Sequence, residues 1–500
     1  MDVVFAASEA VPFAKTGGLA DVSGALPRAL EAQGHCVSLF LPCYRRARQS
    51  GVELKDIGID LRIPIGPRTV EGRVLRSTLP DSNVVTYLID QPEYFDRDGL
   101  YGEGGSDYDD NCARFVFFAR GVIETIQGLG LRPDVVHGND WQSGLIPAYL
   151  RTLHADDPTF AGAGTLITVH NLAYQGLFWH WDMGLTGLDG SLFNWRQLEF
   201  HGKLCFLKAG LVFADVLSTV SPTYAQEILS PEYGHGLDGL FRDRQADLYG
   251  ILNGIDPNAW RPANEPMIAR QYDAATVVEG KALCKARLQE LAGLDRRPEV
   301  PLFAQVGRLD PQKGWDLLAE VADRLLDHDV QLVVLGTGHP KYHAMLEDLA
   351  RRHPGRCTVF LTFDDAMAHR IEAGADLFLM PSLYEPCGLS QLYSLAHGTI
   401  PIVRSTGGLA DTVVDATPRA LSEGTATGFA FADPTASALW QAIERALALW
   451  PDRAAWLNLM RTGMKQDWSW DRSAREYTRL YEEVALRGRS RDAVTQAHRP

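Results

Sequence analysis

The sequence predicts an α/β protein built from two doubly wound domains with parallel sheets. Two observations carry this prediction. Short apolar, β-branched segments alternate with helix-length segments, and the same alternation restarts after a loop-like stretch at about residues 253–301. A strand–helix–strand order gives right-handed crossovers and a parallel sheet with helices on its faces. We therefore expect an N-terminal domain at residues 1–252 and a C-terminal domain at residues 253–467.

The strands are predicted from brief apolar runs bounded by polar, Gly or Pro residues. In the first domain they are residues 3–7, 37–41, 84–89, 135–137, 166–169 and 216–220. In the second domain they are residues 302–306, 331–335, 359–361, 377–380 and 400–403. Helix-length segments at 19–33, 114–127 and 204–214 lie between strands of the first domain.

The end of the chain yields two further expectations. Residues 468–484 carry aromatic anchors at helical spacing, and we expect this helix to cross back to the first domain. Residues 487–500 lack apolar periodicity, so we expect them to be disordered.

Composition and charge exclude several classes of protein. The 500 residues are 46% hydrophobic and 22% charged, which is typical of a folded globular protein. A net charge of −15 argues against general affinity for nucleic acid or an anionic membrane. The seven cysteines are scattered without a C-x-x-C pair, so they indicate neither a disulfide framework nor a zinc site. The N-terminus has no basic leader and no long apolar run, so we expect a cytoplasmic protein without a signal peptide or membrane span.

One six-residue string occurs twice. T-G-G-L-A-D occupies residues 16–21 and again residues 406–411, each time after a predicted strand and at the start of a predicted helix. Glycine permits close backbone approach, and a helix N-terminus offers unpaired N–H groups. Each copy is therefore a candidate cradle for an anion or a sugar hydroxyl, although a Gly-rich turn explains either copy alone equally well.

Charged residues follow two strands of the second domain. Arg308 and Lys313 lie on the loop after residues 302–306, where a guanidinium and an ammonium would stabilise a departing diphosphate. Glu385 follows the strand at 377–380 and precedes a helix, which would keep it ionised and directed at hydroxyl groups. The alternatives are a solvated loop for the cations and a helix-stabilising role for the carboxylate.

Polar and aromatic residues end two strands of the first domain. His170 opens the run H-N-L-A-Y-Q-G, and the earlier strand ends in H-G-N-D-W at residues 137–141. A lone His at a strand end is usually structural. Planar amides and aromatic faces match a pyranose ring, so we interpret His170 as part of a sugar site.

The chain resembles bacterial glycogen synthases and plant starch synthases through six motifs in order. These are K-T-G-G-L at 15–19, H-N-L-A-Y-Q-G at 170–176, L-N-G-I-D at 252–256, R-L-x-x-Q-K-G at 308–314, E-P-C-G-L at 385–389 and T-G-G-L-A-D at 406–411. The resemblance extends from about residue 1 to about residue 484. It implies a GT-B fold, in which two Rossmann-like domains face a central cleft. It also implies transfer of glucose from ADP-glucose to the non-reducing end of an α-1,4-glucan, with retention and release of ADP.

The resemblance also implies roles for individual residues. The catalytic group comprises His170, Arg308, Lys313 and Glu385. The donor-binding group comprises Lys15, Gly18, Asp21, Asn253, Phe363, Cys387, Gly388, Leu389 and Ser390. The residues that contact the acceptor or support the site are Asn139, Asp140, Trp141, Tyr174, Gln175, Thr406, Gly407 and Gly408.

The sequence departs from the family pattern at four positions. Gly307 stands where we expect Ser, and Asn139 and Gln142 stand where many bacterial members have His. Phe363 stands where we expect the Tyr that stacks on adenine, so it keeps the stacking face and loses the hydroxyl.

We expect no cofactor, since ADP-glucose is a co-substrate, and no metal, because Arg308, Lys313 and helix N-termini already compensate the charge of the diphosphate. The D-x-D strings at 96–98, 107–109 and 327–329 do not follow the strand-end pattern of the donor loops, so we interpret them as solvated surface carboxylates. No residue is marked as a β-face nucleophile, so we favour a front-face substitution that relies on positioning and charge stabilisation.

Other functions remain open at this stage. A glucan synthase that uses UDP-glucose and a nucleotide-sugar epimerase are compatible with the same architecture. A dehydrogenase would rest on L-G-T-G at 335–338, which lacks the third glycine of the dinucleotide fingerprint. A non-catalytic glucan-binding protein could dispense with Arg308, Lys313 and Glu385. We expect ADP-glucose and an α-glucan as partners, no nucleic acid and no membrane, and leave the oligomeric state open.

Overall fold

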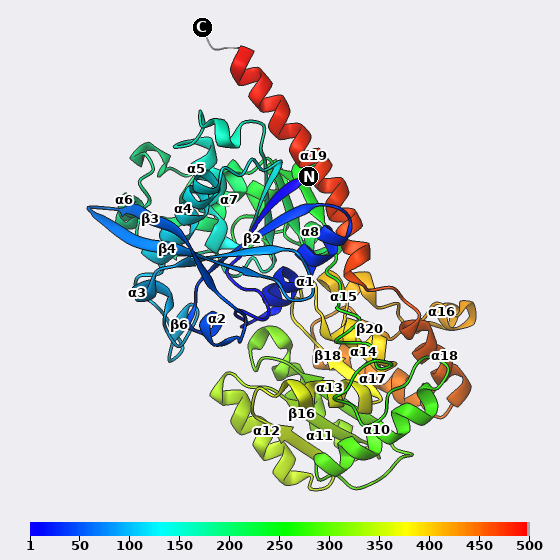
Figure 1. The fold of residues 1–500 in the computed structure, drawn as a ribbon. Coiled ribbons are helices and arrows are strands. Elements are labelled where there is room, and N and C mark those ends of the chain that lie inside the picture. Colours follow the sequence, from blue (N-terminus) through cyan, green and yellow to red (C-terminus); the bar gives the residue numbers. More distant parts are fainter. Residues whose placement is uncertain (498–500) are drawn as a thin grey trace. The chain divides into compact units, whose positions relative to one another are not determined.

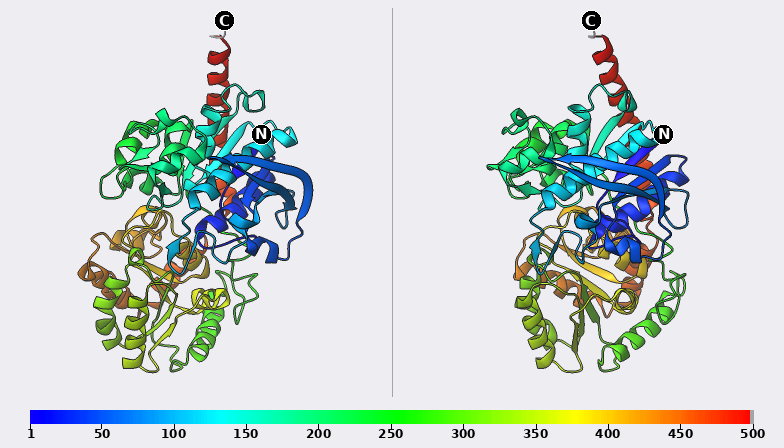
Figure 2. Two further views of the ribbon diagram at one scale, coloured as in Figure 1. Left: turned by 90° about the vertical axis from the view of Figure 1, so that its left-hand side faces the viewer. Right: turned by 60° about the vertical axis from the view of Figure 1, so that its left-hand side comes forward.

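The computed structural model describes residues 1–497, and its chain divides into two compact units (Figure 1). The first unit comprises residues 1–220, 225–253 and the segment from Trp470 onward. The second unit comprises residues 221–224 and 254–469. Each unit contains its own twisted sheet with helices packed against it (Figures 1 and 2).

The sheet of the first unit has nine strands in the order β14-β13-β9-β8-β1-β2-β5-β4-β3. Seven of them, β14 to β5 in this order, run parallel, and β4 and β3 complete the edge as an antiparallel hairpin. Their bounds are β1 Asp2–Ala6, β2 Cys36–Pro42, β3 Lys55–Ile65, β4 Arg68–Thr78, β5 Val85–Asp90, β8 Val135–Asn139, β9 Gly164–Val169, β13 Val216–Thr219 and β14 Leu248–Gly250.

Helices, short strands and 3₁₀ turns complete the first unit. The α-helices are α1 Gly18–Ala32, α2 Arg45–Gln49, α3 Pro92–Phe95, α4 Asn111–Leu129, α5 Leu145–Arg151, α6 Met183–Thr186, α7 Phe206–Phe213, α8 Pro222–Glu227, α9 Asp238–Asp243 and α19 Trp470–Ala497, of which α8 begins in the second unit. The short strands are β6 Gly102–Glu103, β7 Ser106–Asp107, β10 Leu177–Phe178, β11 Glu199–Phe200 and β12 Lys203–Cys205. Single 3₁₀ turns are η1 Trp141–Ser143, η2 Pro158–Phe160, η3 His180–Asp182, η4 Gly190–Leu192 and η5 Gln245–Asp247.

The C-terminal helix α19 packs on the first unit. Tyr477 and Tyr481 are fully buried in the core that also contains β1 and α1, and the Tyr481 hydroxyl lies 2.8 Å from Nδ1 of His137. This burial attaches the last segment of the chain to the N-terminal sheet.

The expectation of disorder after residue 486 is wrong for residues 487–497, because α19 continues to Ala497. Arg487 forms an ion pair with Asp247 at 2.5 Å, and Arg491 pairs with Asp215. These ion pairs lie in the last part of the helix, which has no apolar stripe of its own. Residues 498–500 lie outside the described part of the chain.

The sheet of the second unit has six parallel strands in the order β17-β16-β15-β18-β19-β20. The strands are β15 Leu302–Val306, β16 Gln331–Leu335, β17 Cys357–Phe360, β18 Leu377–Met380, β19 Ile400–Arg404 and β20 Phe429–Phe431. The helices are α10 Val277–Leu291, η6 Pro311–Lys313, α11 Trp315–Asp327, α12 Pro340–Arg352, α13 Asp365–Gly374, α14 Ser390–His397, α15 Gly407–Thr412, α16 Pro418–Glu423, α17 Ala436–Leu449 and α18 Arg453–Met464.

Both faces of this second sheet are buried. Leu332 and Val334 of β16 join one apolar cluster, and their neighbours Val333 and Leu335 join another. Because successive side chains of a strand point to opposite faces, the two clusters lie on the two sides of the sheet. The predicted α/β class with parallel sheets is confirmed.

Sequence reasoning missed the β3–β4 hairpin. The pairing joins residues 55–65 to residues 68–78 across a short turn, and Gly66 in that turn has φ +57°. Ile57, Ile59 and Leu61 alternate with the exposed residues Gly58 and Asp60, which is the period-2 signal of a strand with one buried face.

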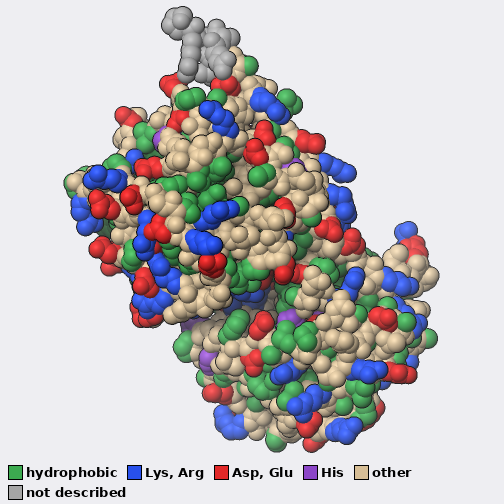
Figure 3. Space-filling model, in the orientation of Figure 1, with side chains coloured by type: hydrophobic (Ala, Val, Ile, Leu, Met, Phe, Trp, Pro, Cys, Tyr) green, Lys and Arg blue, Asp and Glu red, His purple; other side chains and the backbone are tan. Residues whose placement is uncertain are grey.

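The molecular surface carries both signs of charge. Acidic and basic side chains are interspersed over the face in Figure 3. Within the described residues, no helix has the length and apolar character needed to cross a membrane.

Candidate functional site

The charged residues of the second unit lie on loops that leave neighbouring strands. Strands β15, β18 and β19 are adjacent and parallel, so their carboxyl ends meet at one edge of the sheet. The loop at 307–314 follows β15, the loop at 381–389 follows β18, and α15 begins three residues after β19. Ligands of open α/β sheets bind at this edge.

Lys313 and Glu385 meet in this group of loops. Lys313 Nζ donates to Oε2 of Glu385 at 2.6 Å, and the Ser382 hydroxyl donates to the same oxygen at 2.9 Å. The Glu385 side chain is 7% exposed and that of Lys313 is 22% exposed. The carboxylate is therefore held in one orientation, with an ammonium group that remains accessible from solvent.

Arg308 is positioned by the same loop. Its guanidinium donates to Oε1 of Gln312 at 3.2 Å, and its carbonyl accepts a 2.8 Å hydrogen bond from the indole of Trp315. Asp310 caps η6 by accepting from the Gln312 N–H at 2.9 Å, and Gly314 ends this turn with φ +70°. The structure thus places both predicted cations on one braced turn.

The second copy of the repeated string packs against the Glu385 loop. The Gly408 N–H donates to the carbonyls of Glu385 and Pro386, both at 3.1 Å. A Cβ on Gly407 would lie 2.0 Å from the Glu385 carbonyl oxygen, and a Cβ on Gly408 would lie 2.1 Å from that of Cys387. Both positions therefore require glycine, and this contact fixes the backbone next to the carboxylate.

The start of α14 completes this site. Cys387 is buried, Gly388 has φ +73°, and Ser390 is the first residue of the helix. The Gln391 amide donates to the carbonyls of Cys387 and Gly388, both at 3.0 Å. Leu389 occupies the N-cap position of α14. The predicted run 387–390 thus forms a tight turn that leads into a helix.

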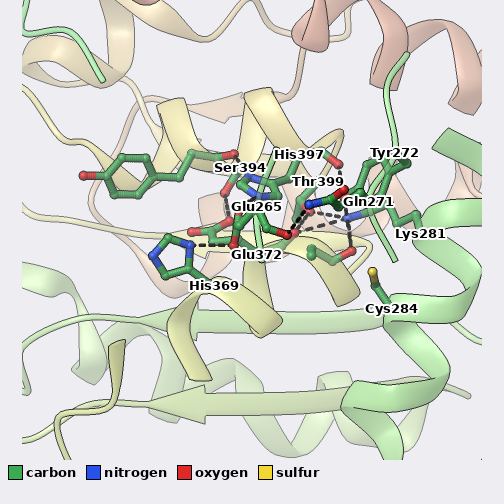
Figure 4. A network of polar contacts seen from close by, with 12 residues as sticks. Glu265, Gln271, Tyr272, Lys281, Cys284, His369, Glu372, Ser394, His397 and Thr399 are labelled. Atoms are coloured by element: carbon green, nitrogen blue, oxygen red, sulfur yellow. Dashed lines mark hydrogen bonds and ion pairs between the residues drawn. The ribbon is translucent and has the colours of Figure 1, made fainter. Parts of the chain in front are cut away.

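A buried polar network anchors the far end of α14 (Figure 4). Glu265 accepts from His369 at 2.6 Å and from His397 at 2.8 Å. The Ser394 hydroxyl donates to Glu372 at 2.7 Å, and burial raises the pKa of Glu372 to about 8. These contacts join α13, α14 and the segment at Glu265, so the helix that carries Ser390 is fixed at both ends.

The predicted sugar residues of the first unit also meet at strand ends. Strands β1, β8 and β9 are neighbours, and Asn139 ends β8 while His170 follows β9. His170 Nε2 lies 2.9 Å from Oδ1 of Asn139, whose amide donates to the Ala6 carbonyl of β1 at 3.1 Å. The structure thus brings His170 and Asn139 together.

Asp140 fixes the backbone of His170. Its Oδ1 accepts from the His170 N–H at 2.7 Å, and its own φ is +56°, which is unusual for a residue other than glycine. Desolvation by the surrounding protein raises the pKa of Asp140 to about 7, although backbone donors oppose this shift. Desolvation also lowers the pKa of His170 to about 3, so the imidazole is neutral near pH 7.

The first copy of the repeated string is held by a carboxylate that sequence reasoning missed. Glu9 is buried after β1 and accepts from the Thr16 N–H, from the Thr16 hydroxyl at 2.5 Å and from the Gly17 N–H at 3.2 Å. The Tyr101 hydroxyl donates to Glu9 at 2.6 Å. Its position directly after a buried strand was the available signal in the sequence.

Lys15 and Asp21 lie next to each other beside this loop. Lys15 Nζ is 2.7 Å from Asp21 Oδ1, and Gly18 between them is the first residue of α1. Both side chains are partly exposed, so the contact by itself contributes little to stability. Lys15, Gly18 and Asp21 therefore form one accessible group of predicted donor residues.

The remaining predicted residues differ in their surroundings. Trp141 is buried and packs against Phe115 with ring centroids 4.7 Å apart, and the Gln175 amide donates to the His235 carbonyl at 3.1 Å. Tyr174 is 51% exposed. Trp141 and Gln175 are thus supporting residues in this structure, whereas Tyr174 presents a ring to solvent.

Phe363 and Asn253 differ in their exposure to solvent. Phe363 is 76% exposed on the loop before α13, and Asn253 is buried at the last residue of the first unit. Thr406 is fully buried at the N-cap position of α15, directly before Gly407.

The sequence and structure comparisons agree over nearly the whole chain. Residues 2–243 match the family model described as starch synthase catalytic domain, and residues 289–460 match glycosyl transferases group 1. The chain is 46% identical over 481 residues to a glycogen synthase of Syntrophotalea carbinolica, covering 96% of this chain and 98% of the relative. It is 49% identical to a glycogen synthase of an Anaeromyxobacter species, covering 97% of this chain and 100% of the relative.

A solved structure extends this likeness. It is the catalytic domain of starch synthase IV from Arabidopsis thaliana, bound to ADP and acarbose. The two chains are 32% identical and superpose with a TM-score of 0.89. The match covers 97% of this chain and 99% of the starch synthase chain. The sequence-based resemblance and the GT-B fold are therefore confirmed. The chain belongs to the glycogen and starch synthase family of glycosyltransferases.

Proposed function

We propose that this protein is a glycogen synthase that transfers glucose from ADP-glucose to the non-reducing end of an α-1,4-glucan, with retention and release of ADP. The glycogen synthase relatives and the ADP-bound starch synthase support this donor and acceptor. The observation that carries the proposal is the group formed by Lys313, Glu385 and Ser382, with Arg308 on the same braced turn.

In this proposal the second unit binds the donor. Arg308 and Lys313 neutralise the negative charge that develops on the departing diphosphate. The Glu385 carboxylate accepts a hydrogen bond from a hydroxyl of the transferred glucose. The Ser390 end of α14 adds N–H groups, which favour an anion. Phe363 offers an exposed ring for the adenine base.

The first unit orients the transferred sugar. His170 is neutral and is held by Asn139 and by Asp140, so it acts by hydrogen bonding rather than as a charged acid. Because His170 follows the end of β9, we expect its imidazole to form a hydrogen bond with a hydroxyl of glucose. Lys15 and Asp21 form a further accessible polar group for the donor.

We propose front-face substitution, in which the leaving diphosphate oxygen accepts the proton of the acceptor hydroxyl. Oε2 of Glu385 already receives hydrogen bonds from Lys313 and Ser382, which lowers the nucleophilicity of this carboxylate. Positioning and charge stabilisation are then the main contributions of the protein.

The reaction is proposed to need no metal. Both carboxylates of the D-x-D string at 96–98 form ion pairs with Arg45, Asp96 at 2.7 Å and Asp98 at 2.5 Å. Asp329 is likewise paired with Arg297. Arg308 and Lys313 supply the charge that a divalent cation would otherwise bring. The proposal further places the enzyme in the cytoplasm, without nucleic-acid or membrane partners.

The test is glucose transfer from radiolabelled donors. ADP-glucose and UDP-glucose are assayed side by side with glycogen, with and without exhaustive EDTA treatment. We expect faster transfer from ADP-glucose, unchanged by EDTA. Preference for UDP-glucose would refute the proposed donor, and turnover of donor without glycogen would favour an epimerase. A loss of activity restored specifically by Mg²⁺ or Mn²⁺ would refute the metal-free mechanism.

A further inference from the structure

One segment of the second unit contacts two of its helices at once. This segment, residues 254–276, precedes α10, and we call it the strap. Its Trp260 stacks on His369 of α13 with ring centroids 3.8 Å apart, and on Tyr393 of α14 with ring centroids 3.6 Å apart. Both pairs of rings are nearly parallel, with interplanar angles of 9° and 10°. A single indole of the strap therefore packs against both α13 and α14.

Glu265 of the strap binds the same two helices by hydrogen bonds (Figure 4). Its Oε1 accepts from Nδ1 of His369 at 2.6 Å, and its Oε2 accepts from Nε2 of His397 at 2.8 Å. The side chains of Glu265 and His397 are fully buried. Burial by itself raises the pKa of Glu265, but the hydrogen bonds from the two histidines outweigh it and bring the pKa below its ordinary value. Glu265 is therefore an ionised carboxylate near pH 7.

The partners of His397 define how many protons its ring carries. Nε2 faces the carboxylate of Glu265, and Nδ1 lies 2.8 Å from the carbonyl oxygen of Tyr393. A carboxylate and a carbonyl group can only accept hydrogen bonds, so both ring nitrogens must donate. His397 is therefore an imidazolium, and it forms a buried ion pair with Glu265.

A second carboxyl group in the same network is in the opposite state. Glu372 of α13 accepts a hydrogen bond from the Ser394 hydroxyl of α14 at 2.7 Å, and burial raises the pKa of Glu372 to about 8. Near pH 7 this carboxyl group is therefore neutral and acts by hydrogen bonding alone. An amide can replace a neutral carboxyl group more easily than an ionised one, so Glu265 and Glu372 should respond differently to the same substitution.

Helix α14 links the ion pair to the predicted donor site. His397 is the last residue of this helix, and Ser390 is the first. At a rise of 1.5 Å per residue, the two ends of the helix are about 10 Å apart. In the proposed function, the N–H groups at the Ser390 end favour the diphosphate of the donor. A short helix moves as a unit, so a shift of its last residue also moves its first turn.

We infer that the ion pair between Glu265 and His397 positions α14 for the donor diphosphate, which makes both side chains positioning residues for glucose transfer. This inference rests on the proposed role of the second unit in donor binding. Both side chains are fully buried, so they act through α14 and not by contact with the donor. Removal of one charge leaves the other buried without a partner, which favours a shift of the helix that carries it.

The test compares Glu265→Gln with the wild type. Glutamine keeps the size of the side chain but removes its charge, and its amide oxygen replaces only one of the two carboxylate oxygens. Steady-state rates are measured at a temperature where calorimetry shows the variant to be folded, and the Kd for ADP is measured by titration calorimetry. We expect kcat/KM for ADP-glucose to fall about tenfold or more and the Kd for ADP to rise about threefold or more. The KM for glycogen should stay within about twofold of wild type, because the network includes none of the predicted acceptor residues.

Two controls make the result specific. Glu372→Gln applies the same substitution to the neutral carboxyl group, and the amide oxygen can still accept from Ser394. Its kcat/KM for ADP-glucose should stay within about twofold of wild type. Asp376→Asn breaks a different buried ion pair of the same unit, which Asp376 forms with Lys285 of α10 at 2.6 Å. This variant should lower Tm and keep kcat/KM for ADP-glucose within about twofold of wild type.

Wild-type values of kcat/KM for ADP-glucose and of the Kd for ADP in Glu265→Gln would overturn the inference. Equal falls of kcat/KM in Glu265→Gln and Asp376→Asn would also overturn it, because a loss of stability alone would then explain the effect. Equal falls in Glu265→Gln and Glu372→Gln would refute the assignment of charge to the pair. If Glu265→Gln does not fold, His397→Gln, which keeps one donor toward Glu265, is measured in its place with the same expectations. Failure of the wild type to transfer glucose from ADP-glucose would refute the proposed function separately, since ADP binding is scored without turnover.

Discussion

The glycine contact between the two loops of the second unit gives a sharp prediction. In Gly407→Ala, the new Cβ would lie 2.0 Å from the Glu385 carbonyl oxygen, at a residue whose φ is +44°. Relief of the overlap requires a shift of about 1 Å or more in the loop that holds the carboxylate. Left-handed backbone for Ala costs about 1–2 kcal/mol and overpacking costs about 1–3 kcal/mol.

The expected outcome is therefore a loss of about 2–5 kcal/mol in the free energy of unfolding of the second unit. This corresponds to a fall of about 4–20 °C in its Tm, measured by scanning calorimetry. A displacement of about 1 Å at Glu385 should also lower kcat by about 100-fold at a temperature where the variant is folded.

The other copy of the repeated string supplies the matched control. Gly17 has the same place in the string, yet a Cβ there would meet no atom within 4 Å, and its φ is −151°. Gly17→Ala should therefore keep Tm within about 2 °C of wild type. Equal Tm and kcat for Gly407→Ala and wild type would refute the reasoning, because the contact with Glu385 would then be loose.

Three further predictions concern single residues. Lys313→Ala should lower kcat by about 100-fold or more in steady-state assays, since the charge on the departing diphosphate would lose its partner; a change in KM alone would contradict this. Glu385→Gln should bind ADP with nearly unchanged Kd by calorimetry yet transfer glucose poorly, and near-normal turnover would leave Glu385 with only a helix-stabilising role. His170 has a lowered pKa, so its stabilising contribution is present above pH 6.5 and is lost as pH falls toward 3. Urea unfolding of the wild type should therefore lose up to about 2 kcal/mol from this group between pH 7 and pH 5, and His170→Asn should lose correspondingly less; equal losses would contradict the lowered pKa.

The buried strands were the part of the fold that sequence predicted best. The structure places β15, β16 and β18 at the predicted residues 302–306, 331–335 and 377–380. These strands are covered on both faces, so their apolar runs are continuous and easy to recognise. The β3–β4 hairpin has one face on the core, so its apolar residues alternate with exposed ones and form no continuous run.

The C-terminal extension of α19 was missed for a different reason. Its stabilising partners are Asp215 and Asp247, which are more than 200 positions away in the sequence. Ion pairs with distant residues leave no periodic signal in the local sequence. A prediction based on apolar periodicity alone therefore ends the helix too early.

In the candidate site too, sequence reasoning found the residues that follow predicted strands and missed those that act through distant contacts. Sequence reasoning identified Lys313 and Glu385 because each follows a predicted strand, and sheet topology then brings residues 72 positions apart to within 2.6 Å. Ser382 and Glu9 were missed, since their importance lies in the hydrogen bonds they make with Glu385 and with the loop at 15–18. Such supporting contacts depend on packing in three dimensions, and the position of Glu9 after β1 was the signal that the sequence offered for it.

The most direct test of the central claim is the structure of the reaction product. Purified protein is incubated with ADP-[¹³C]glucose and maltotriose, and the labelled tetrasaccharide and the released ADP are measured by NMR and chromatography. The proposed reaction predicts one ADP per glucose transferred and a new α-1,4 linkage at the non-reducing end. A β-linked product, label at the reducing end, or ADP released without a tetrasaccharide would contradict it.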